Sequence, residues 1–215
     1  MGMPPSLSAT IGADLVSSFL DRFPQVRLHL IDGFSGYVNE WLAAGRLDMA
    51  IINNARKSPY VRMDPLLFVD LFLVGRRDMI DVREDDGETM PTRLLADLPL
   101  LLVGQHHGLR RALESAAQKL SIDLAIRAEV DSLNALRSLV RNGYGITVLP
   151  HGAISEELSD PNLIVRRLVE PDLFQQFMLA YSLQRPTTLA MRELARSIRQ
   201  KIRQGVENGT IVGRL

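Results

Sequence analysis

The chain contains the same order of elements twice, and this repetition limits its fold more than any other feature. Between Val26 and Ile52, an apolar strand is followed by a polar, glycine-rich turn, a helix and a second strand. The same order returns between Ile126 and Leu149, with Gly143 ending the helix before the last strand. Apolar residues three or four positions apart predict a helix, and short apolar runs predict buried strands. We therefore predict an α/β protein with two lobes and mainly parallel sheets.

In both copies the polar turn lies where a parallel strand ends and a helix begins. This edge of an open α/β sheet is where ligands bind. The positive end of a helix, its amide groups and a nearby hydroxyl can hold an anion such as a carboxylate or a phosphate. We predict helix starts of this kind at Ser6, Ser35, Gly108 and Ser132. A serine before a helix is most often only an N-cap, so each position also has a purely structural explanation.

Two lobes would turn several of these helix starts toward one cleft, which favours a binding function. Asn53 ends its predicted strand, and His106 and His107 lie in the turn after an apolar strand at residues 100–103. These are the side chains best placed to add specificity. His107 has the alternative of capping its own helix or facing solvent.

The remaining patterns predict the elements around the two copies. A first helix starts at Pro4-Pro5-Ser6, with the Ser6 hydroxyl as its cap. A final helix follows Pro186-Thr187-Thr188, and its basic outer face is interpreted as solvated. The tail from Gly205 to Leu215 has little apolar periodicity, and we expect it to be disordered. We further expect strands at 68–74, 163–165 and 177–181, a solvated loop at 76–92 and a short helix at 154–158.

The composition argues against several functions. The 25 basic and 25 acidic residues give a formal net charge of zero, whereas nucleic-acid binding usually requires a basic surface. The chain has no cysteine, so neither a disulfide nor thiolate chemistry is available to it. No apolar run approaches the roughly 20 residues that cross a bilayer. Residues 1–6 lack the pattern of a secretion signal, and we expect no membrane partner.

No arrangement of residues in the sequence predicts catalysis. Gly33-Phe34-Ser35-Gly36 resembles a nucleophile elbow, but that motif requires a glycine two residues after the serine, where Tyr37 stands. His106 and His107 are adjacent and point in different directions, with no third ligand at metal spacing. We therefore expect no enzyme, no metal site and no cofactor.

Several stretches resemble the effector-binding domain of LysR-type transcriptional regulators. Gly45-Arg46-Leu47-Asp48 before an apolar strand is a specific signal, and Gly143-Tyr144-Gly145-Ile146 strengthens it. The resemblance covers nearly the whole chain, to about Lys201. Its other matching stretches are Pro4-Pro5-Ser6, Leu30 to Gly36, Leu71 to Gly75, His107 to Arg110, and Glu129 to Leu133. The last two are most similar to the branch that contains the nitrogen assimilation control regulators.

The resemblance implies a fold like the type II periplasmic binding proteins, with two α/β lobes, two crossing strands and a ligand in the cleft. We assign residues 1–74 and 176–215 to the first lobe and 75–175 to the second. The implied ligand is a small, often anionic metabolite, although some members of the branch need no effector. Asn53 departs from members with a basic residue there, which argues against an aromatic dicarboxylate. The implied ligand-binding residues are Ser6, Ser35, Gly36, Asn53, Gly104, His106, His107 and Ser132.

The family resemblance also implies a cytoplasmic sensor that self-associates as a dimer or tetramer, side by side and antiparallel. The helix from Leu7 to Phe23 is expected to contribute its outer face. Family members carry a winged helix-turn-helix before this domain, and we expect this chain to be a fragment that reaches DNA only through that missing domain. The alternatives are a solute-binding protein of a transport system with the same fold, and a small enzyme with an acid or base in the cleft.

Overall fold

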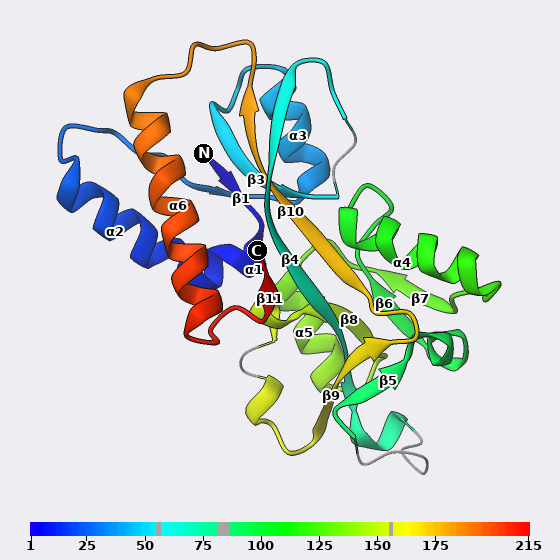
Figure 1. Ribbon diagram of the computed structural model, residues 1–215. Helices are drawn as coiled ribbons and strands as arrows, with labels where there is room; N and C mark the ends of the chain where they lie inside the picture. The colour runs from blue at the N-terminus through cyan, green and yellow to red at the C-terminus, as the bar shows by residue number, and fades with distance from the viewer. Residues whose placement is uncertain (55–56, 81–86, 155–156) are drawn as a thin grey trace. The chain divides into compact units, whose positions relative to one another are not determined.

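Two strands carry the chain between two units that are best described separately. The computed structural model describes residues 1–54, 57–80, 87–154 and 157–215. Unit 1 comprises Met1–Val69 and Gln176–Leu215, and unit 2 comprises Asp70–Gln175. The chain leaves unit 1 along β4 (Val61–Arg76) and returns along β10 (Phe174–Ser182), as the teal and orange strands of Figure 1 show. The boundary expected at residue 74 lies inside β4, because residues 61–67 and 68–74 form one continuous strand.

The sheet of unit 1 is parallel at one side and antiparallel at the other. Its strands lie in the order β2-β1-β3-β10-β4. Here β1 is Gly2–Met3, β2 is Ile31–Asp32 and β3 is Met49–Asn53. Strand β1 runs parallel to both β2 and β3, whereas β10 is antiparallel to β3. The three parallel strands therefore end at the same edge.

Alternation along β3 builds a core on each face of this sheet. Met49 and Ile51 join a cluster with residues of α2 (Ala13–Arg22) and α6 (Leu189–Glu207). Ala50 and Ile52 join a second cluster with residues of α3 (Ser35–Ala43). Successive strand residues point to opposite faces, so a fully apolar strand requires cover on both. Figure 1 shows α2 and α6 side by side, and the two helices are in contact.

The first helix differs from the prediction at its start. It begins with the short α1 (Pro5–Leu7), continues through a π-helical turn (Ser8–Gly12) and ends as α2. Pro4 is the N-cap and no side chain caps the helix, so the cap predicted at Ser6 was wrong. A capping side chain must come from the extended residue before the helix, and Ser6 lies within the first turn. The apolar spacing of Ile11, Leu15, Phe19 and Phe23 predicts an inward face for this helix, and the first three are buried while Phe23 is half-buried.

The predicted strand starting at Val26 is much shorter in the structure. Only Ile31–Asp32 forms β2, because its partner β1 offers just two residues to pair with. Val26, Leu28 and Leu30 still pack against the core of unit 1 without strand pairing. The apolar pattern of Val26, Leu28 and Leu30 therefore predicted correctly that these side chains pack against the core, but predicted their secondary structure wrongly.

The C-terminal segment is ordered, contrary to the expectation of a disordered tail. Helix α6 continues to Glu207, and Thr188 caps its start by accepting from the Met191 amide at 3.2 Å. Ile211 is buried in the core of unit 1, at 5% exposure. Strand β11 (Gly213–Arg214) then pairs antiparallel with β4. The predicted inward face of α6 is confirmed by the burial of Met191, Leu194, Ala195, Ile198 and Ile202.

Unit 2 contains two sets of paired strands. Strand β4 pairs antiparallel with β8 (Thr147–Pro150) and β9 (Leu163–Val169), and β9 is parallel to β5 (Thr89–Pro91). Strand β6 (Leu100–Leu102) is parallel to β7 (Ile126–Glu129), and Ile146 adds a parallel bridge to Leu100. β6 is fully buried, as its apolar run predicted.

Helices α4 (Gly108–Leu120) and α5 (Leu133–Arg141) complete the pattern predicted for unit 2. Gly143 has φ +74° just after α5, a left-handed conformation that favours glycine and ends the helix. The loop expected at 76–92 instead contains a 3-10 turn and β5, and its residues 81–86 lie outside the described residues. The helix expected at 154–158 is partly outside them too. Further 3-10 turns lie at Arg77–Met79, Thr92–Asp97, His151–Ala153 and Glu157–Ser159.

Candidate functional site

Most of the predicted site residues lie at the carboxyl-terminal edge of parallel strands in their own unit. In unit 1, α1 follows β1, α3 follows β2, and Asn53 ends β3. In unit 2, the Gly104–His107 turn follows β6, and Ser132 follows β7. Parallel neighbours end together, so Ser6, Ser35 and Asn53 share one edge, as do the two polar segments of unit 2. This edge is the usual ligand position in open α/β sheets.

Ser35 and Asn53 form a close pair in unit 1. The Ser35 hydroxyl donates to Asn53 Oδ1, and the Asn53 backbone amide donates to Ser35 Oγ at 2.8 Å. Ser35 is buried, whereas Asn53 is half-buried. The hydroxyl hydrogen of Ser35 thus points to Oδ1 of Asn53. The other end of the Asn53 side-chain amide, Nδ2, is a hydrogen-bond donor. The pair connects the start of α3 to the end of β3.

Ser35 is the first residue of α3 rather than its N-cap. Phe34 occupies the cap position and no side chain caps the helix. Gly36 follows in the first turn, where backbone amides lack partners within the helix. Ser6 is half-buried in α1, and its carbonyl oxygen accepts from the Thr10 hydroxyl at 2.8 Å.

His107 and Gly104 are joined in unit 2 by a residue that the sequence analysis did not select. Asp131 Oδ1 accepts from the Gly104 amide at 2.8 Å and contacts His107 Nε2 at 2.9 Å. The His107 amide also donates to the Gly104 carbonyl at 3.1 Å, which closes the turn before α4. His107 is buried at 3% exposure and occupies the N-cap position of α4 without a side-chain cap. The alternatives that the His107 side chain caps its own helix or faces solvent are therefore both wrong.

Ser132 and His106 are the exposed members of this group. Ser132 is the N-cap of α5, and its Oγ accepts from the Ala135 amide at 3.4 Å. This confirms the capping role that the sequence suggested for Ser132. His106 is exposed, and its carbonyl accepts from Arg111 Nη1 at 2.8 Å. A weak signal for Asp131 was available, because this residue directly precedes Ser132 in the second polar turn.

Burial lowers the pKa of His107 below its ordinary value, and the charge and hydrogen bond of Asp131 oppose this only in part. The nearby side chains of His106 and Arg111 add smaller shifts of the His107 pKa in the lowering direction. His107 is therefore neutral at pH 7, and its Nε2–H donates to the carboxylate. The geometry provides a rigid donor–acceptor pair rather than an ion pair.

This pKa shift predicts a loss of stability under mildly acidic conditions. The unfolded chain protonates His107 near pH 6.5, whereas the folded chain protonates it only at lower pH. The stability contribution of neutral His107 is thus complete above pH 6.5 and is lost as pH falls through the folded pKa. Its slope is at most about 1.4 kcal/mol per pH unit. The His107→Gln variant should show a flatter stability profile between pH 7 and pH 5 in urea unfolding.

Half-buried His151 also has a pKa lowered by burial, so part of the slope will persist in the His107→Gln variant. Identical profiles for the parent and His107→Gln would contradict the prediction.

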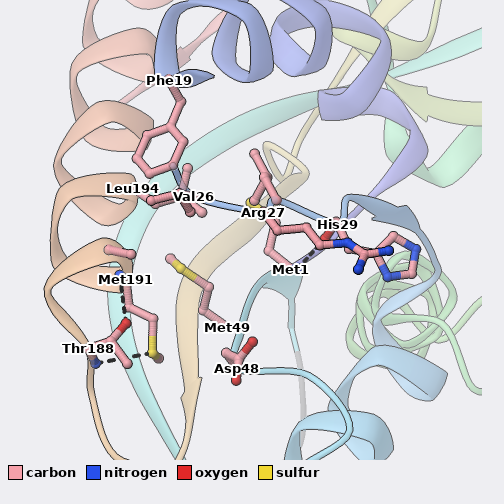
Figure 2. A pocket seen from close by; sticks show the side chains of 12 residues that line it. Met1, Phe19, Val26, Arg27, His29, Asp48, Met49, Thr188, Met191 and Leu194 are labelled. Carbon is pink, nitrogen blue, oxygen red and sulfur yellow. Dashed lines mark hydrogen bonds between the residues drawn. The ribbon is translucent and has the colours of Figure 1, made fainter. Parts of the chain in front are cut away.

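Unit 1 also contains a cavity that none of the predicted residues lines. Its volume is about 260 Å³, and its walls come from α2, residues 26–29, the start of β3 and the start of α6 (Figure 2). Its lining includes the apolar side chains of Phe19, Val26, Met49, Met191 and Leu194 and the polar side chains of Arg27, His29, Asp48 and Thr188, all labelled in Figure 2. The cavity is thus suited to a small amphipathic molecule. It is an alternative to the strand edge as the ligand-binding site of unit 1.

Within the described residues, no group of three or more His, Asp or Glu side chains is arranged to hold a metal ion. Nor does any helix in the described part of the chain have the length and hydropathy needed to span a membrane.

The chain belongs to the LysR substrate-binding domain family, whose model matches residues 1–203. The match covers both units, including the polar edges described above. The fold is accordingly that of the LysR effector-binding domains, which is type II periplasmic-binding-protein-like, as the resemblance implied.

Curated relatives of this chain are transcriptional regulators. The nitrogen assimilation regulatory protein Nac of Klebsiella aerogenes is 26% identical over 202 residues, covering 92% of this chain and 64% of that protein. The regulator BbuR of Bordetella bronchiseptica is 29% identical over 224 residues, covering 99% of this chain and 66% of that protein. The chain thus spans just under two thirds of the length of these relatives. The similarity to a nitrogen assimilation regulator was predicted from the sequence.

Solved structures support the same fold. The effector-binding domain of QuiR in complex with shikimate has a TM-score of 0.82 at 20% identity, covering 94% of this chain and 95% of that one. The regulatory domain of CcmR from Synechocystis PCC6803, in complex with 2-PG, has a TM-score of 0.80 at 16% identity, covering 93% and 94%. These likenesses show the fold, whereas the family match and the curated relatives favour the regulatory interpretation over the transport alternative.

Proposed function

We propose that the chain is the ligand-sensing part of a cytoplasmic transcriptional regulator, and that the polar strand edges of its two units hold the ligand. The observation that carries this proposal is the family match together with the position of Ser35, Asn53, Gly104, His107 and Ser132 at these edges. Each edge offers backbone amides at a helix start and polar side chains beside them. Relatives of the same family bind small molecules, including shikimate and 2-PG.

A ligand acts in this proposal by shifting a conformational equilibrium. It must bind one arrangement of the protein more tightly than another to alter DNA binding by the whole regulator. Coupling of this kind is typically about 1–3 kcal/mol. The chain itself is proposed to act as a homodimer or tetramer, which sedimentation equilibrium would test, and to reach DNA only through other parts of the protein. It is not proposed to catalyse a reaction.

Peroxide sensing by thiols is not part of the proposal. The peroxide-responsive regulator OxyR of Escherichia coli is among the relatives, at 22% identity. Because the present chain contains no cysteine, a thiol switch has no residue to act on within these 215 positions. A reversible, non-covalent ligand is therefore the better match.

Ligand-induced stabilisation provides the direct test. We expect one or more small metabolites, with shikimate and 2-PG as the first probes, to raise the melting temperature of the chain. A ligand at 100 times its Kd stabilises the folded state by about 2.7 kcal/mol. The Ser35→Ala and Ser132→Ala variants should fold and lose most of this stabilisation. Loss of the Ser35–Asn53 hydrogen bonds should itself cost about 1 kcal/mol.

Thr188→Ala is the matched control, because Thr188 caps α6 as Ser132 caps α5. Both cap losses should cost about 1 kcal/mol of stability, but only the Ser132 change should weaken ligand binding. Thr188 lines the cavity of Figure 2. A ligand response that disappears in Thr188→Ala and persists in both serine variants would place binding in that cavity and overturn the proposed edges.

A further inference from the structure

The Asp131 carboxylate occupies the polar edge of unit 2 in a way that restricts which ligands this edge can accept. Its Oδ1 atom accepts from the Gly104 amide and from His107 Nε2, at 2.8 and 2.9 Å. A Cβ atom at Gly104 would lie 3.2 Å from Asp131 Oδ2, so the glycine allows the carboxylate to lie close against the turn. The Asp131 side chain is nevertheless 46% exposed, and a ligand at this edge can reach it.

Gly104 and His107 orient the Asp131 carboxylate without neutralising its charge. His107 contacts it as a neutral donor, because burial keeps the imidazole uncharged at pH 7. Arg110, the buried cation at the start of α4, is 2.8 Å from Glu114 and 2.8 Å from Glu129. Its Nη1 also donates to the Val103 carbonyl at 3.2 Å. The positive charge of Arg110 is thus matched by two other carboxylates.

We propose that Asp131 is a specificity-determining residue, which makes the edge of unit 2 select a ligand with a hydroxyl or ammonium donor and disfavour a second anionic group there. The inference rests on the proposed function and narrows its ligand class. An ionised carboxylate only accepts hydrogen bonds, and it has lone pairs beyond the two used on Oδ1. A hydrogen-bond donor of the ligand can bond to these remaining lone pairs. An anionic oxygen of the ligand at the same position is instead repelled by the like charge of the carboxylate.

The ligand class that follows is a hydroxy acid or an amino acid rather than a simple dianion. Its donor group contacts Asp131, while its own carboxylate lies away from that residue. The sequence alone favoured an anion at every helix start, because helix starts carry partial positive charge. Asp131 changes this expectation for unit 2, because its own carboxylate already places a negative charge at this edge.

A matched series of four-carbon acids tests the inference. Succinate, malate and aspartate differ only at one carbon, which carries hydrogen, hydroxyl or ammonium. Backbone amide shifts of Gly104, His107 and Ser132 in ¹⁵N NMR titrations report binding at this edge. We expect malate or aspartate to bind the parent protein on the order of tenfold more tightly than succinate. Asp131→Asn should remove this preference, chiefly by improving succinate binding, while its side-chain oxygen still accepts from the Gly104 amide.

Two further variants separate charge from structure. Asp131→Glu retains the charge and should retain the discrimination against succinate, although its reach is different. Asp123→Asn removes an exposed carboxylate elsewhere in unit 2 and should leave the ranking of the three acids unchanged. A parent protein that binds all three acids equally, prefers succinate, or shows no response of these amides to any of them overturns the inference.

The failure of this inference is distinguishable from failure of the proposed function. A metabolite that stabilises the parent protein, loses its effect in the serine variants and binds Asp131→Asn unchanged would support the sensing function and refute the role of Asp131. The opposite result is a metabolite screen in which no compound stabilises the protein, while the acid series still shifts these amides. This result would count against the sensing function and would leave the proposed preference of Asp131 unaffected.

Discussion

Replacing Glu157 by alanine is expected to lower the stability of the protein by about 3–5 kcal/mol. The Glu157 side chain is fully buried, and its Oε1 atom contacts Arg137 Nε at 2.6 Å and Arg141 Nη2 at 3.0 Å. The two arginines are four residues apart on α5, so they present their charges on one face of the helix. Alanine would leave the largely buried Arg137 without the carboxylate that offsets its burial, whereas Arg141 is 38% exposed and is compensated in part by solvent. For a chain of this length, the melting temperature should fall by roughly 6–20 °C.

An exposed ion pair in the same unit provides the control for Glu157. Asp172 lies 3.3 Å from Arg167, and its side chain is 61% exposed. Asp172→Asn should cost no more than about 1 kcal/mol, because solvent screens such pairs. Thermal unfolding followed by circular dichroism measures both variants. Equal and small losses would show that the buried network contributes no more than a surface pair.

Replacing Ile211 by alanine is expected to cost about 2–5 kcal/mol of stability, although only four residues follow it in this sequence. Ile211 is buried in the core of unit 1. A Cβ atom on Gly205 would lie 2.7 Å from Ile211 Cδ1, so the glycine of α6 leaves the space that the isoleucine fills. Alanine would leave a cavity beside this helix and weaken the position of β11 against β4.

Leu215 is the matched control for Ile211, since it lies in the same segment and is 61% exposed. Leu215→Ala should change stability by less than about 0.5 kcal/mol. Denaturant unfolding of both variants measures their free energies of unfolding and so tests whether the C-terminal segment is packed against the core. If the Ile211 variant were as stable as the Leu215 variant, the packing of the C-terminal segment would be refuted.

The helices of the two repeated copies could be predicted because their signals are local. Val38 and Leu42 in α3, and Leu136 and Val140 in α5, follow the spacing of one helix face, and all four are buried. Gly143 could be recognised as a helix end because its conformation depends on its own lack of a side chain. The final helix followed in the same way from its threonine cap and its apolar stripe.

Pairing between distant segments was not predictable in the same way. Strand β2 is short because β1 offers only two partners, and the residues before it keep their burial without pairing. The tail carries too few apolar residues to show a pattern. Its order depends on the space left by Gly205 and on the edge of β4, neither of which is visible in residues 206–215.

The features of the candidate site also divide into those predictable from local sequence and those that depend on the tertiary structure. By itself, the sequence determined that polar turns follow parallel strands in two copies, that Ser132 caps its helix, and which family the chain resembles. These properties depend on residues close together in the chain. Only the tertiary structure decided that Ser35 is held by Asn53, and that Asp131 joins Gly104 to His107. These contacts require β2 and β3, which both pair with β1, or β6 and β7, which pair with each other, to end at a common edge. The hydrogen-bonded residues are 18 and 27 positions apart, so their contact depends on strand pairing rather than on local pattern.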